Sequence, residues 1–308
     1  MTSLKIMLYG SANLFHSVDF TSCTTAVSSN LRDLAIGGSV RWILPSHGSG
    51  LHLPNLQQLS LSTDVGCDIA VVLGACPNIS KLSIDVRSVV GENYTENITV
   101  PHLTTISVLA GEIAASNLLM DRLHCPSLRK FHLTTLGVVD ALSLRRIKHF
   151  ISRSTIRDRP SSSLKALHLE YSPSFQTEYS PNNSVLVQIL KEILRPLSDL
   201  NDLRLYNVFI NEEIVKCLTP LSGGRLETKE ICPFLECLCL GCTYVKSAAL
   251  NDALEEMVIS RWKSRRGPLD ITLAIESFKG ARKRQRIKEC LEEGLEGHFS
   301  NVCDRIVY

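Results

Sequence analysis

A short phrase of apolar and polar positions recurs along the chain. Its clearest copy is Cys125-Pro126-Ser127-Leu128-Arg129-Lys130-Phe131-His132-Leu133, in which two residues separate the first apolar position from the second and one separates the second from the third. The last three residues alternate between apolar and polar, as in a half-buried β-strand. Proline cannot continue a helix, so the Cys-Pro pair should end the segment before the strand. The phrase therefore predicts a turn followed by a short strand.

The same phrase returns at two nearly constant spacings. Counted from its first apolar residue, the spacings are 25, 23, 24 and 25 residues as far as Leu128, and then 36, 36 and 35 residues. The first period matches the roughly 20–29-residue leucine-rich repeat, in which a strand and a return segment form one turn of a horseshoe. The longer units add about ten residues, enough for a full helix. The other clear copies begin at Leu31, Leu56, Ile79, Leu103, Leu164, Leu200 and Leu235, and weaker copies begin at Leu4 and Pro268.

The stretches between the strands carry apolar residues at helical spacing. Helices are predicted over residues 68–73, 113–120, 138–152, 185–194 and 250–258. A single unit cannot bury its apolar face alone, so the units must stack on one another. We therefore predict an α/β fold, a leucine-rich-repeat solenoid (horseshoe) with a parallel sheet on the concave side and helices on the convex side. It should span residues 1–275 as about ten units, followed by a C-terminal helical cap or tail over residues 276–308.

The composition is that of a folded protein with no strong charge. Hydrophobic residues make up 44% and charged residues 21% of the 308 residues, near the averages for globular proteins. Lys+Arg 33 and Asp+Glu 31 nearly cancel, which argues against nucleic acid as a partner. No run of about 18 apolar residues occurs, so we expect no membrane partner either.

Two features bear on the compartment. The N-terminus has too short an apolar core for a signal peptide, and 11 cysteines in a chain of this size favour free thiols in a reducing compartment, so we expect the cytoplasm or the nucleus. The basic segment Lys279–Arg286, which follows Arg265-Arg266, resembles a two-part nuclear import signal. The alternative is a solvated helix face, because Glu289 and Glu292 balance the charge shortly afterwards.

The cysteines raise the question of a metal site. Cys76 and Cys125 precede proline just ahead of a strand, as Cys232 also does, which suggests one small apolar niche repeated along the chain. The run Cys232-x4-Cys237-x-Cys239-x2-Cys242 is compatible with zinc. No second Cys or His pair follows at the usual distance, so structural thiols are the favoured interpretation. We expect neither a metal nor a cofactor.

The sequence lacks the common catalytic motifs. It contains no Gly-x-x-x-x-Gly-Lys-Ser/Thr phosphate loop, no His-Glu-x-x-His pair and no Gly-x-Ser-x-Gly elbow. Its nine histidines are scattered without a ligand pair at helical spacing. These absences favour a binding protein over an enzyme.

The repeats resemble those of F-box proteins. The stretch Leu254–Trp262 (Leu-Glu-Glu-Met-Val-Ile-Ser-Arg-Trp), followed by Pro268–Leu273, is similar to the C-terminal end of leucine-rich-repeat F-box proteins of mushroom-forming fungi. The resemblance implies a non-enzymatic role in which the repeats recognise a target protein for a cullin-type (SCF) ubiquitin ligase. It also implies a ligase adaptor subunit as a second partner.

Two other functions stay open. Residues 1–30 are interpreted as the first repeat, and no Leu-Pro-x-Glu-like opening of an F-box is found. A stand-alone repeat scaffold that has lost ligase docking is therefore the alternative, and a repeat-borne enzyme is a remote third possibility.

The polar positions on either side of the second and third apolar residues should face a partner on the concave side. They include Lys81, Ser83 and Asp202. Arginine and tyrosine often carry the binding energy of interfaces, so strands that combine them with other charged residues are the best candidates for a binding surface. The predicted partner-binding residues are Lys130, His132, His168, Glu170, Arg204 and Tyr206.

Overall fold

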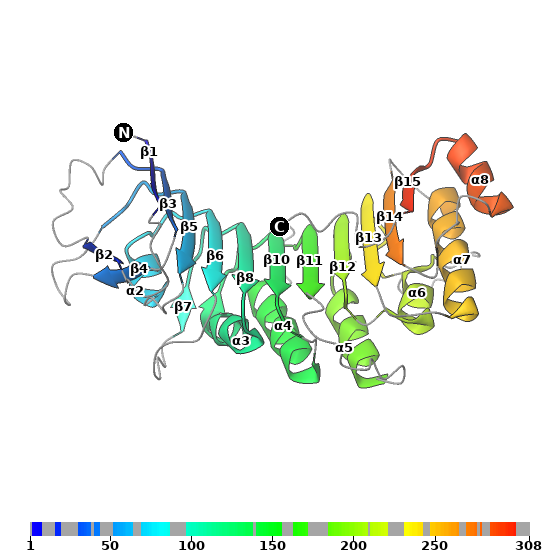
Figure 1. Cartoon of the computed structure of the whole chain (residues 1–308), viewed down its shortest axis with the longest axis horizontal. Helices are drawn as coiled ribbons and strands as arrows, with labels where there is room; N and C mark the ends of the chain where they lie inside the picture. Colours follow the sequence, from blue (N-terminus) through cyan, green and yellow to red (C-terminus); the bar gives the residue numbers. More distant parts are fainter. Residues whose placement is uncertain are drawn as a thin grey trace. The chain divides into compact units, whose positions relative to one another are not determined.

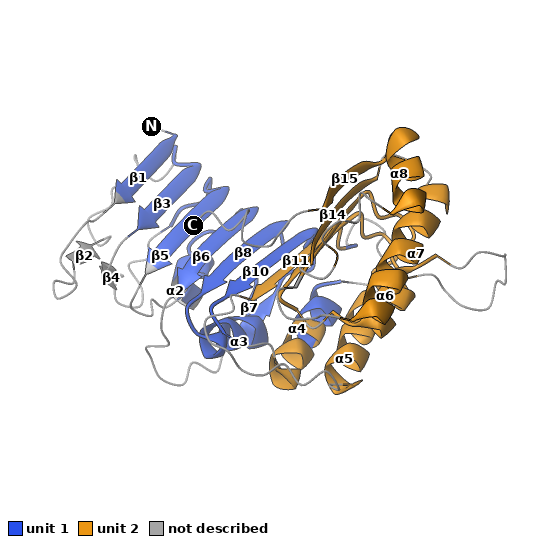
Figure 2. Ribbon diagram, turned by 45° about the vertical axis from the view of Figure 1, so that its right-hand side comes forward, with its two compact units in different colours: residues 1–137, 149–163 blue, residues 138–148, 164–308 orange. Residues whose placement is uncertain are grey.

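Eleven strands form one large open parallel sheet (Figure 1). The structure is a computed structural model, and its strands follow the order β1-β3-β5-β6-β8-β10-β11-β12-β13-β14-β15. The chain divides into two compact units, residues 1–137 with 149–163 (unit 1) and residues 138–148 with 164–308 (unit 2) (Figure 2). The residues described are 2–7, 16–19, 30–37, 40–43, 52–63, 69–86, 97–137, 140–155, 163–171, 184–208, 210–220, 231–242, 247–264, 269–275, 278 and 284–299.

Unit 1 contains the strands with the shorter spacing. Its register pairs Leu34 with Leu59, Leu82 with Ile106, and Ile106 with Phe131. These are the second apolar positions of successive phrases, so the alignment predicted from the sequence is confirmed here. The strands are β1 (Ser3–Met7), β3 (Asp33–Gly37), β5 (Gln58–Thr63), β6 (Lys81–Val86), β8 (Thr105–Ala110) and β10 (Lys130–Thr135).

Besides these strands, the described residues of unit 1 form two short helices and two small parallel sheets. The predicted helices are present as α2 (Ile69–Gly74) and α3 (Ile113–Arg122). The sequence analysis did not foresee the two-stranded sheets, which are β2 (His16–Asp19) with β4 (Val40–Ile43), and β7 (Ile98–Thr99) with β9 (Leu123–His124). The predicted helix α4 (Ala141–Ser154) has residues in both units.

Unit 2 repeats the same arrangement with longer connections. Its register pairs Leu167 with Leu203, Leu203 with Leu238, and Leu238 with Ile271, again at the second apolar position. Figure 1 shows α5, α6 and α7 on the same side of these strands. The elements are β11 (Ala166–Tyr171), α5 (Ser184–Leu194), β12 (Asp202–Tyr206), α6 (Glu212–Leu218), β13 (Cys237–Cys242), α7 (Ala248–Ser264), β14 (Asp270–Ile275), α8 (Gln285–Glu292) and β15 (Glu296–Phe299).

The strand-helix alternation continues past residue 275. The sequence analysis expects a helical cap or tail there, and α8 supplies a helix, but β15 then pairs in parallel with β14. A glycine, Gly297, takes the position opposite Ile271. Because this strand lacks the large apolar residue of the repeated phrase, the pattern did not reveal it.

The core consists of the apolar positions of the phrase and the helices that pack on them. Leu82 in unit 1 is 1% exposed and Leu203 in unit 2 is 0% exposed. Burying one such side chain contributes about 1.5–3 kcal/mol relative to leaving it in water. In unit 1 the rings of Phe131 and Phe150 add an aromatic contact, with centroids 5.1 Å apart. Among the described residues, no helix is long and apolar enough to cross a bilayer.

The three cysteines that precede proline occupy the predicted apolar niche. Cys76, Cys125 and Cys232 are all buried. Burial raises the pKa of each thiol to about 12, although Arg153 opposes the effect at Cys125 and Arg261 opposes it at Cys232. A thiol with so high a pKa stays protonated at neutral pH and is unreactive. These three cysteines therefore serve packing.

The stretch Leu254–Trp262 joins three parts of unit 2. The buried Arg261 donates to the carbonyl oxygens of Ile231 and Cys232 at 3.2 Å each. Cys232 has a φ of 51°, the left-handed conformation that residues with a side chain rarely adopt, so these bonds help to fix a strained turn. Trp262 Nε1 donates to Glu293 Oε2 at 2.9 Å, which ties α7 to the end of α8. The polar residues of this stretch thus have structural partners.

Candidate functional site

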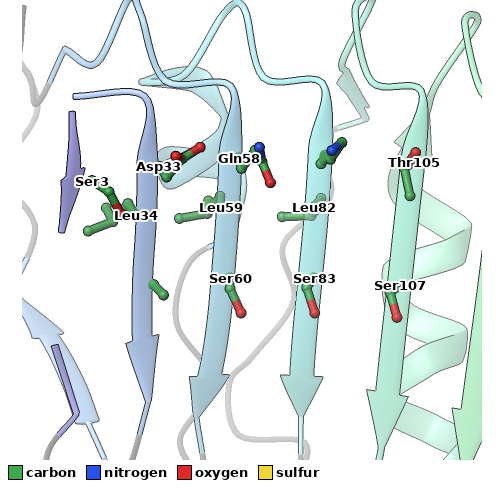
Figure 3. Close-up of a pocket in the computed structure, with 12 residues that line it drawn as sticks. Ser3, Asp33, Leu34, Gln58, Leu59, Ser60, Leu82, Ser83, Thr105 and Ser107 are labelled. Carbon is green, nitrogen blue, oxygen red and sulfur yellow. The ribbon is translucent and has the colours of Figure 1, made fainter. Parts of the chain in front are cut away.

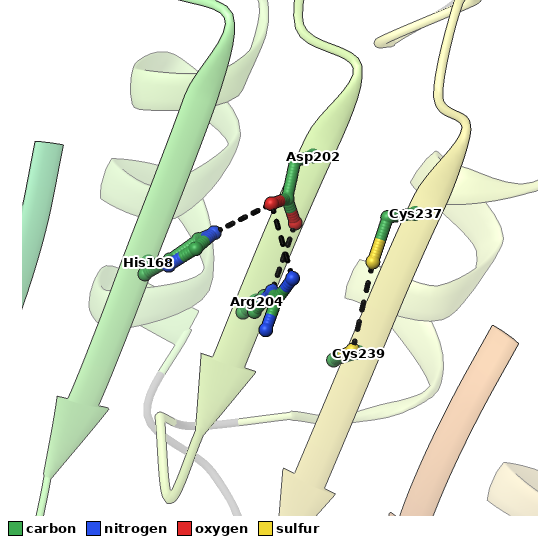
Figure 4. Close-up of polar contacts among 5 residues, drawn as sticks. All are labelled: His168, Asp202, Arg204, Cys237 and Cys239. Atoms are coloured by element: carbon green, nitrogen blue, oxygen red, sulfur yellow. Dashed lines mark hydrogen bonds and ion pairs between the residues drawn. The ribbon is translucent and has the colours of Figure 1, made fainter. Parts of the chain in front are cut away.

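The side chains between the apolar positions lie on the face of the sheet opposite the helices. We call this the open face. It follows from the alternation of a strand: Leu203 and Leu205 are buried, while Asp202, Arg204 and Tyr206 between and beside them are half-buried. Figure 4 shows the polar side chains of β11, β12 and β13 in front of the strands, with helices behind them.

Asp202 is the centre of a cluster on the open face of unit 2. His168 Nε2 lies 2.8 Å from Asp202 Oδ2. Arg204 donates from Nε to Oδ1 at 3.0 Å and from Nη2 to Oδ2 at 3.3 Å. The register explains the cluster, because it places His168 of β11 beside Arg204, and Arg204 lies two residues after Asp202 on the same side of β12. One carboxylate therefore holds a histidine and an arginine from adjacent strands.

The contacts with His168 and Arg204 favour the charged form of Asp202. Burial alone would raise the pKa of Asp202, but hydrogen bonds from His168 and Arg204 and their charges hold it well below its ordinary value. The hydrogen bond to Asp202 raises the pKa of Arg204 in turn, against the effect of its partial burial. The Arg204 side chain is 42% exposed and that of Asp202 is 24% exposed. The carboxylate is therefore the anchor, and the guanidinium is the group offered to solvent.

Tyr206 lies across the neighbouring strand. A Cβ built on Gly241 of β13 would be 2.4 Å from Tyr206 Cδ1 and 3.0 Å from its Cε1. No side chain tolerates a contact of 2.4 Å, so the tyrosine ring occupies the space that only a glycine leaves free. Gly241 is the register partner of Tyr206, and Glu170 is its partner on the other side. The ring is therefore held against the sheet.

Two cysteines follow on β13. Cys237 Sγ and Cys239 Sγ lie 3.9 Å apart on the open face, beside Arg204. Hydrogen bonds from Cys237, Tyr206 and Thr272 lower the pKa of Cys239 against the effect of its burial. Holding that shared proton raises the pKa of Cys237. The two thiols therefore share a hydrogen bond in which Cys237 keeps its proton.

The four-cysteine run does not come together as one site in the part of the chain that the structure describes. Cys232 is buried and its thiol points to the carbonyl oxygen of Leu194, while Cys237 and Cys239 lie on the open face. The side chain of Cys242 lies outside the described residues. No group of three or more His, Cys, Asp or Glu side chains among the described residues could hold a metal ion.

Three neighbouring strands of unit 1 carry small residues in the central row of the open face. Ser60, Ser83 and Ser107 pair with one another across β5, β6 and β8 and form a row of hydroxyl groups (Figure 3). They line a hollow of about 310 Å³ together with Ser3 of β1, Asp33 of β3 and other residues of β5, β6 and β8. The next residue in this row is His132, whose ring nitrogens lie 3.5 Å from Ser107 Oγ and 3.2 Å from the hydroxyl of Thr134.

The six predicted residues thus separate into two groups. His168, Glu170, Arg204 and Tyr206 share the open face of unit 2, and Asp202 joins two of them directly. Lys130 and His132 belong to unit 1, where Lys130 is exposed at the start of β10. The sequence analysis placed Asp202 among the outward-facing positions and interpreted Cys237 and Cys239 as structural thiols, but it did not include these three among the predicted partner-binding residues. The register between phrases was the available signal, because it places His168, Arg204 and Cys239 in one row.

The described part of the basic segment is tied to α7. Arg284 forms ion pairs with Asp252 at 3.2 Å and with Glu255, and Arg286 pairs with Glu256 at 3.0 Å. These pairs fit the alternative of a charged helix surface. The remaining candidates for an import signal, residues 265–266 and 279–283, lie outside the described residues.

Comparison with protein-family models, with curated proteins and with solved structures gives no significant match for this chain. The resemblance to F-box proteins therefore rests on the repeated phrase and the stretch Leu254–Trp262.

Proposed function

We propose that this chain is a non-enzymatic leucine-rich-repeat scaffold that binds a partner protein on the open face of unit 2. The observation that carries the proposal is the cluster around Asp202. It holds His168 and Arg204 in fixed positions, with Tyr206 beside them, on the side of the sheet opposite the helices.

The arrangement suits protein recognition for two reasons. Arginine and tyrosine are enriched among the residues that dominate interface energies. Their side chains normally lose rotamer freedom on binding, at a cost of about 0.5–1.5 kcal/mol each. Here the hydrogen bonds to Asp202 and the contact with Gly241 have already restricted them. Folding has therefore already removed most of the rotamer freedom of these side chains, so a partner that binds this face causes little further loss of entropy.

Catalysis by the same cluster is the weaker alternative. A His-Asp pair can orient a general base, and His168 with Asp202 has that composition. However, both carboxylate oxygens of Asp202 also accept hydrogen bonds from Arg204, which competes with His168 for the group that would orient the imidazole. The cluster is better suited to presenting positive charge than to moving protons.

We further propose that the bound partner is a target protein presented to a cullin-type ubiquitin ligase. The repeated phrase and the stretch Leu254–Trp262 support this role through their resemblance to F-box proteins. Affinity purification from the native cell, followed by mass spectrometry, tests it. Recovery of the ligase adaptor and the cullin is expected. If other proteins are retained without those subunits, the stand-alone scaffold is the correct function.

The binding face itself is tested by the double variant Arg204→Ala/Tyr206→Ala. Capture of the partners found by purification should fall at least about tenfold, because two interface anchors are lost. The matched control is Arg286→Ala/Phe234→Ala, which removes a cation and an exposed aromatic ring of unit 2 outside the strand rows. Equal capture by the open-face variant and the control would refute the assignment of this face, with circular dichroism confirming that both are folded.

A further inference from the structure

Two lysines with a threonine between them lie in one row on the open face of unit 1. The register pairs Lys81 of β6 with Thr105 of β8, and Thr105 with Lys130 of β10. Both lysines are exposed. Within the part of the chain that the structure describes, neither forms an ion pair or a side-chain hydrogen bond. Both ammonium groups are therefore available to a ligand.

Hydroxyl groups surround the space between the two lysines. Ser83 and Ser107 stand two residues after Lys81 and Thr105, so their side chains leave the same face of the sheet. Figure 3 shows Ser83, Thr105 and Ser107 together on this face, where they line the hollow with Lys81. A hydroxyl donates a hydrogen bond as well as accepting one. The lysines thus stand beside neutral donors that suit an anion.

The nearest carboxylates of unit 1 leave this positive charge uncompensated. Asp85 stands four residues after Lys81 on β6, about 13 Å along the strand, and it accepts a hydrogen bond from Ser62 at 2.8 Å. Asp33 lies two strands away from Lys81, with the uncharged Gln58 between them. The row across β3, β5, β6, β8 and β10 therefore reads acid, amide, lysine, threonine, lysine, with its positive end at β6–β10.

The spacing of the lysines suits two carboxylates on one side of an extended peptide. The strands β6 and β10 are two strand spacings apart, about 9.6 Å. Alternate residues of an extended chain point to the same side and lie about 6.6 Å apart. The difference of about 3 Å is divided between two flexible lysine side chains. A single small anion would instead draw two like charges to one point, which costs energy.

We propose that Lys81, Thr105 and Lys130 form a docking site for an extended acidic peptide segment, in which two carboxylate side chains are separated by one residue. Each lysine pairs with one carboxylate, and the hydroxyls of Thr105 and Ser107 donate hydrogen bonds to the carboxylate oxygens. The site lies on other strands than the Asp202 cluster, so it goes beyond the proposed recognition on unit 2. It also gives the predicted residue Lys130 a partner of defined charge.

The test is fluorescence anisotropy with the full chain and a labelled peptide, acetyl-Gly-Ser-Glu-Thr-Glu-Ser-Gly-amide. This probe should bind at least about fivefold more tightly than the same peptide with glutamine at both glutamate positions, because an exposed ion pair contributes up to about fivefold and two are lost. A third peptide, acetyl-Gly-Ser-Thr-Glu-Glu-Ser-Gly-amide, has the same charge but directs only one carboxylate toward the sheet. It should bind about two- to fivefold more weakly than the probe.

Reversal of the charge on the protein tests the same contacts from the other side. Lys81→Glu/Lys130→Glu should weaken binding of the glutamate probe more than about tenfold and should prefer a probe with lysine at both glutamate positions, because like charges then face each other only in the first complex. The matched control is Arg32→Glu/Arg129→Glu, which changes the net charge equally at two exposed arginines just ahead of β3 and β10. It should keep the preference of the wild type. Circular dichroism checks that both variants are folded.

Three results would overturn the proposal. The first is equal binding of the glutamate probe and the glutamine peptide by the wild type, or of the glutamate probe by the wild type and the charge-reversed variant. The second is equal binding of the spaced and the adjacent glutamates, which would mean unspecific attraction of negative charge. The third is displacement of the probe by an equal concentration of inorganic phosphate, which would mean a small-anion site. No residue of unit 2 is changed in this experiment, so the site and the proposed function fail or survive separately.

Discussion

The two units have the same pattern of buried leucines but different residues on the open face. In unit 1 a central row of that face reads Ser60, Ser83 and Ser107. In unit 2 the row at the same position of the repeat contains His168, Arg204 and Cys239. The leucines behind these rows keep the same register in both units. The buried side therefore sets the positions of the residues, and the open face can differ in chemistry without disturbing the fold.

The length of the side chains on the open face determines whether they reach one another across the strands. The serines of unit 1 are short, and they line a hollow (Figure 3). The residues of unit 2 are long enough to reach the next strand, as His168 does toward Asp202 and Tyr206 does over Gly241. Long side chains at the same spacing thus build a connected surface, and short ones leave an open trough.

The largest effect is expected where the units are alike. Leu82→Ala in unit 1 and Leu203→Ala in unit 2 should each lower the free energy of unfolding by about 2–5 kcal/mol, because each removes a buried side chain and leaves a cavity. Urea denaturation followed by circular dichroism measures both. Ser83→Ala on the open face is the control and should cost less than about 0.5 kcal/mol. A large effect of Leu82→Ala beside a negligible effect of Leu203→Ala would contradict a shared framework.

An intermediate effect is expected where the units differ in packing. Gly241→Ala should destabilise the protein by about 1–3 kcal/mol, because the new methyl group overlaps the ring of Tyr206. Gly137→Ala in unit 1 is the matched control, since its Cβ would meet neighbours only at 3.7 Å or more. Combining Gly241→Ala with Tyr206→Ala should recover much of the loss in thermal unfolding. Strictly additive losses would show that the ring does not lie over the glycine.

The smallest effect is expected from charge. Asp202→Asn should cost about 1 kcal/mol at pH 7, through the weakened hydrogen bonds to His168 and Arg204. The pKa of Asp202 is lowered by folding, so its contribution is present above the ordinary aspartate pKa of about 3.9 and is lost as the pH falls through the folded value. The difference between wild type and variant should therefore shrink below about pH 4.

The control for this titration lies at the equivalent position of unit 1. Gln58→Ala changes a residue that cannot ionise at the start of β5, as Asp202 stands at the start of β12. Its effect on the unfolding free energy should not depend on pH. If the Asp202→Asn difference stayed constant from pH 7 to pH 3, the carboxylate would not be the anchor of the cluster.

The sequence predicted the strands and their register well, for a physical reason. A one-residue shift would turn every leucine of a strand toward solvent, so the apolar positions alone determine which residues pair. The weak copy at the N-terminus was aligned wrongly, because it puts Leu4 level with Leu31, whereas β1 pairs Leu4 with Leu34 at the second apolar position. The sequence did not reveal α6 or β15, because α6 has only 7 residues and β15 has a glycine, Gly297, at the second apolar position.

The candidate site could be predicted only in part. Alternation placed Arg204 and Tyr206 on the correct face, since the neighbouring leucines must point the other way. The bridging role of Asp202 depends on side-chain rotamers, and the contact of Tyr206 with Gly241 depends on a missing Cβ on another strand. The apolar pattern predicts the face on which a side chain lies but not its rotamer, so these two contacts could not be predicted.

The parallel register has a consequence for any extended partner that crosses the strands. Neighbouring strands are about 4.8 Å apart, whereas an extended chain advances about 3.3 Å per residue. The two lengths first coincide at about 10 Å, after three residues of the partner and two strands of the sheet. Because successive side chains of an extended chain point to opposite sides, the third residue of the partner faces away from the sheet. A partner side chain that meets His168 on β11 therefore has its next match about six positions later, four strands on, at His298 of β15.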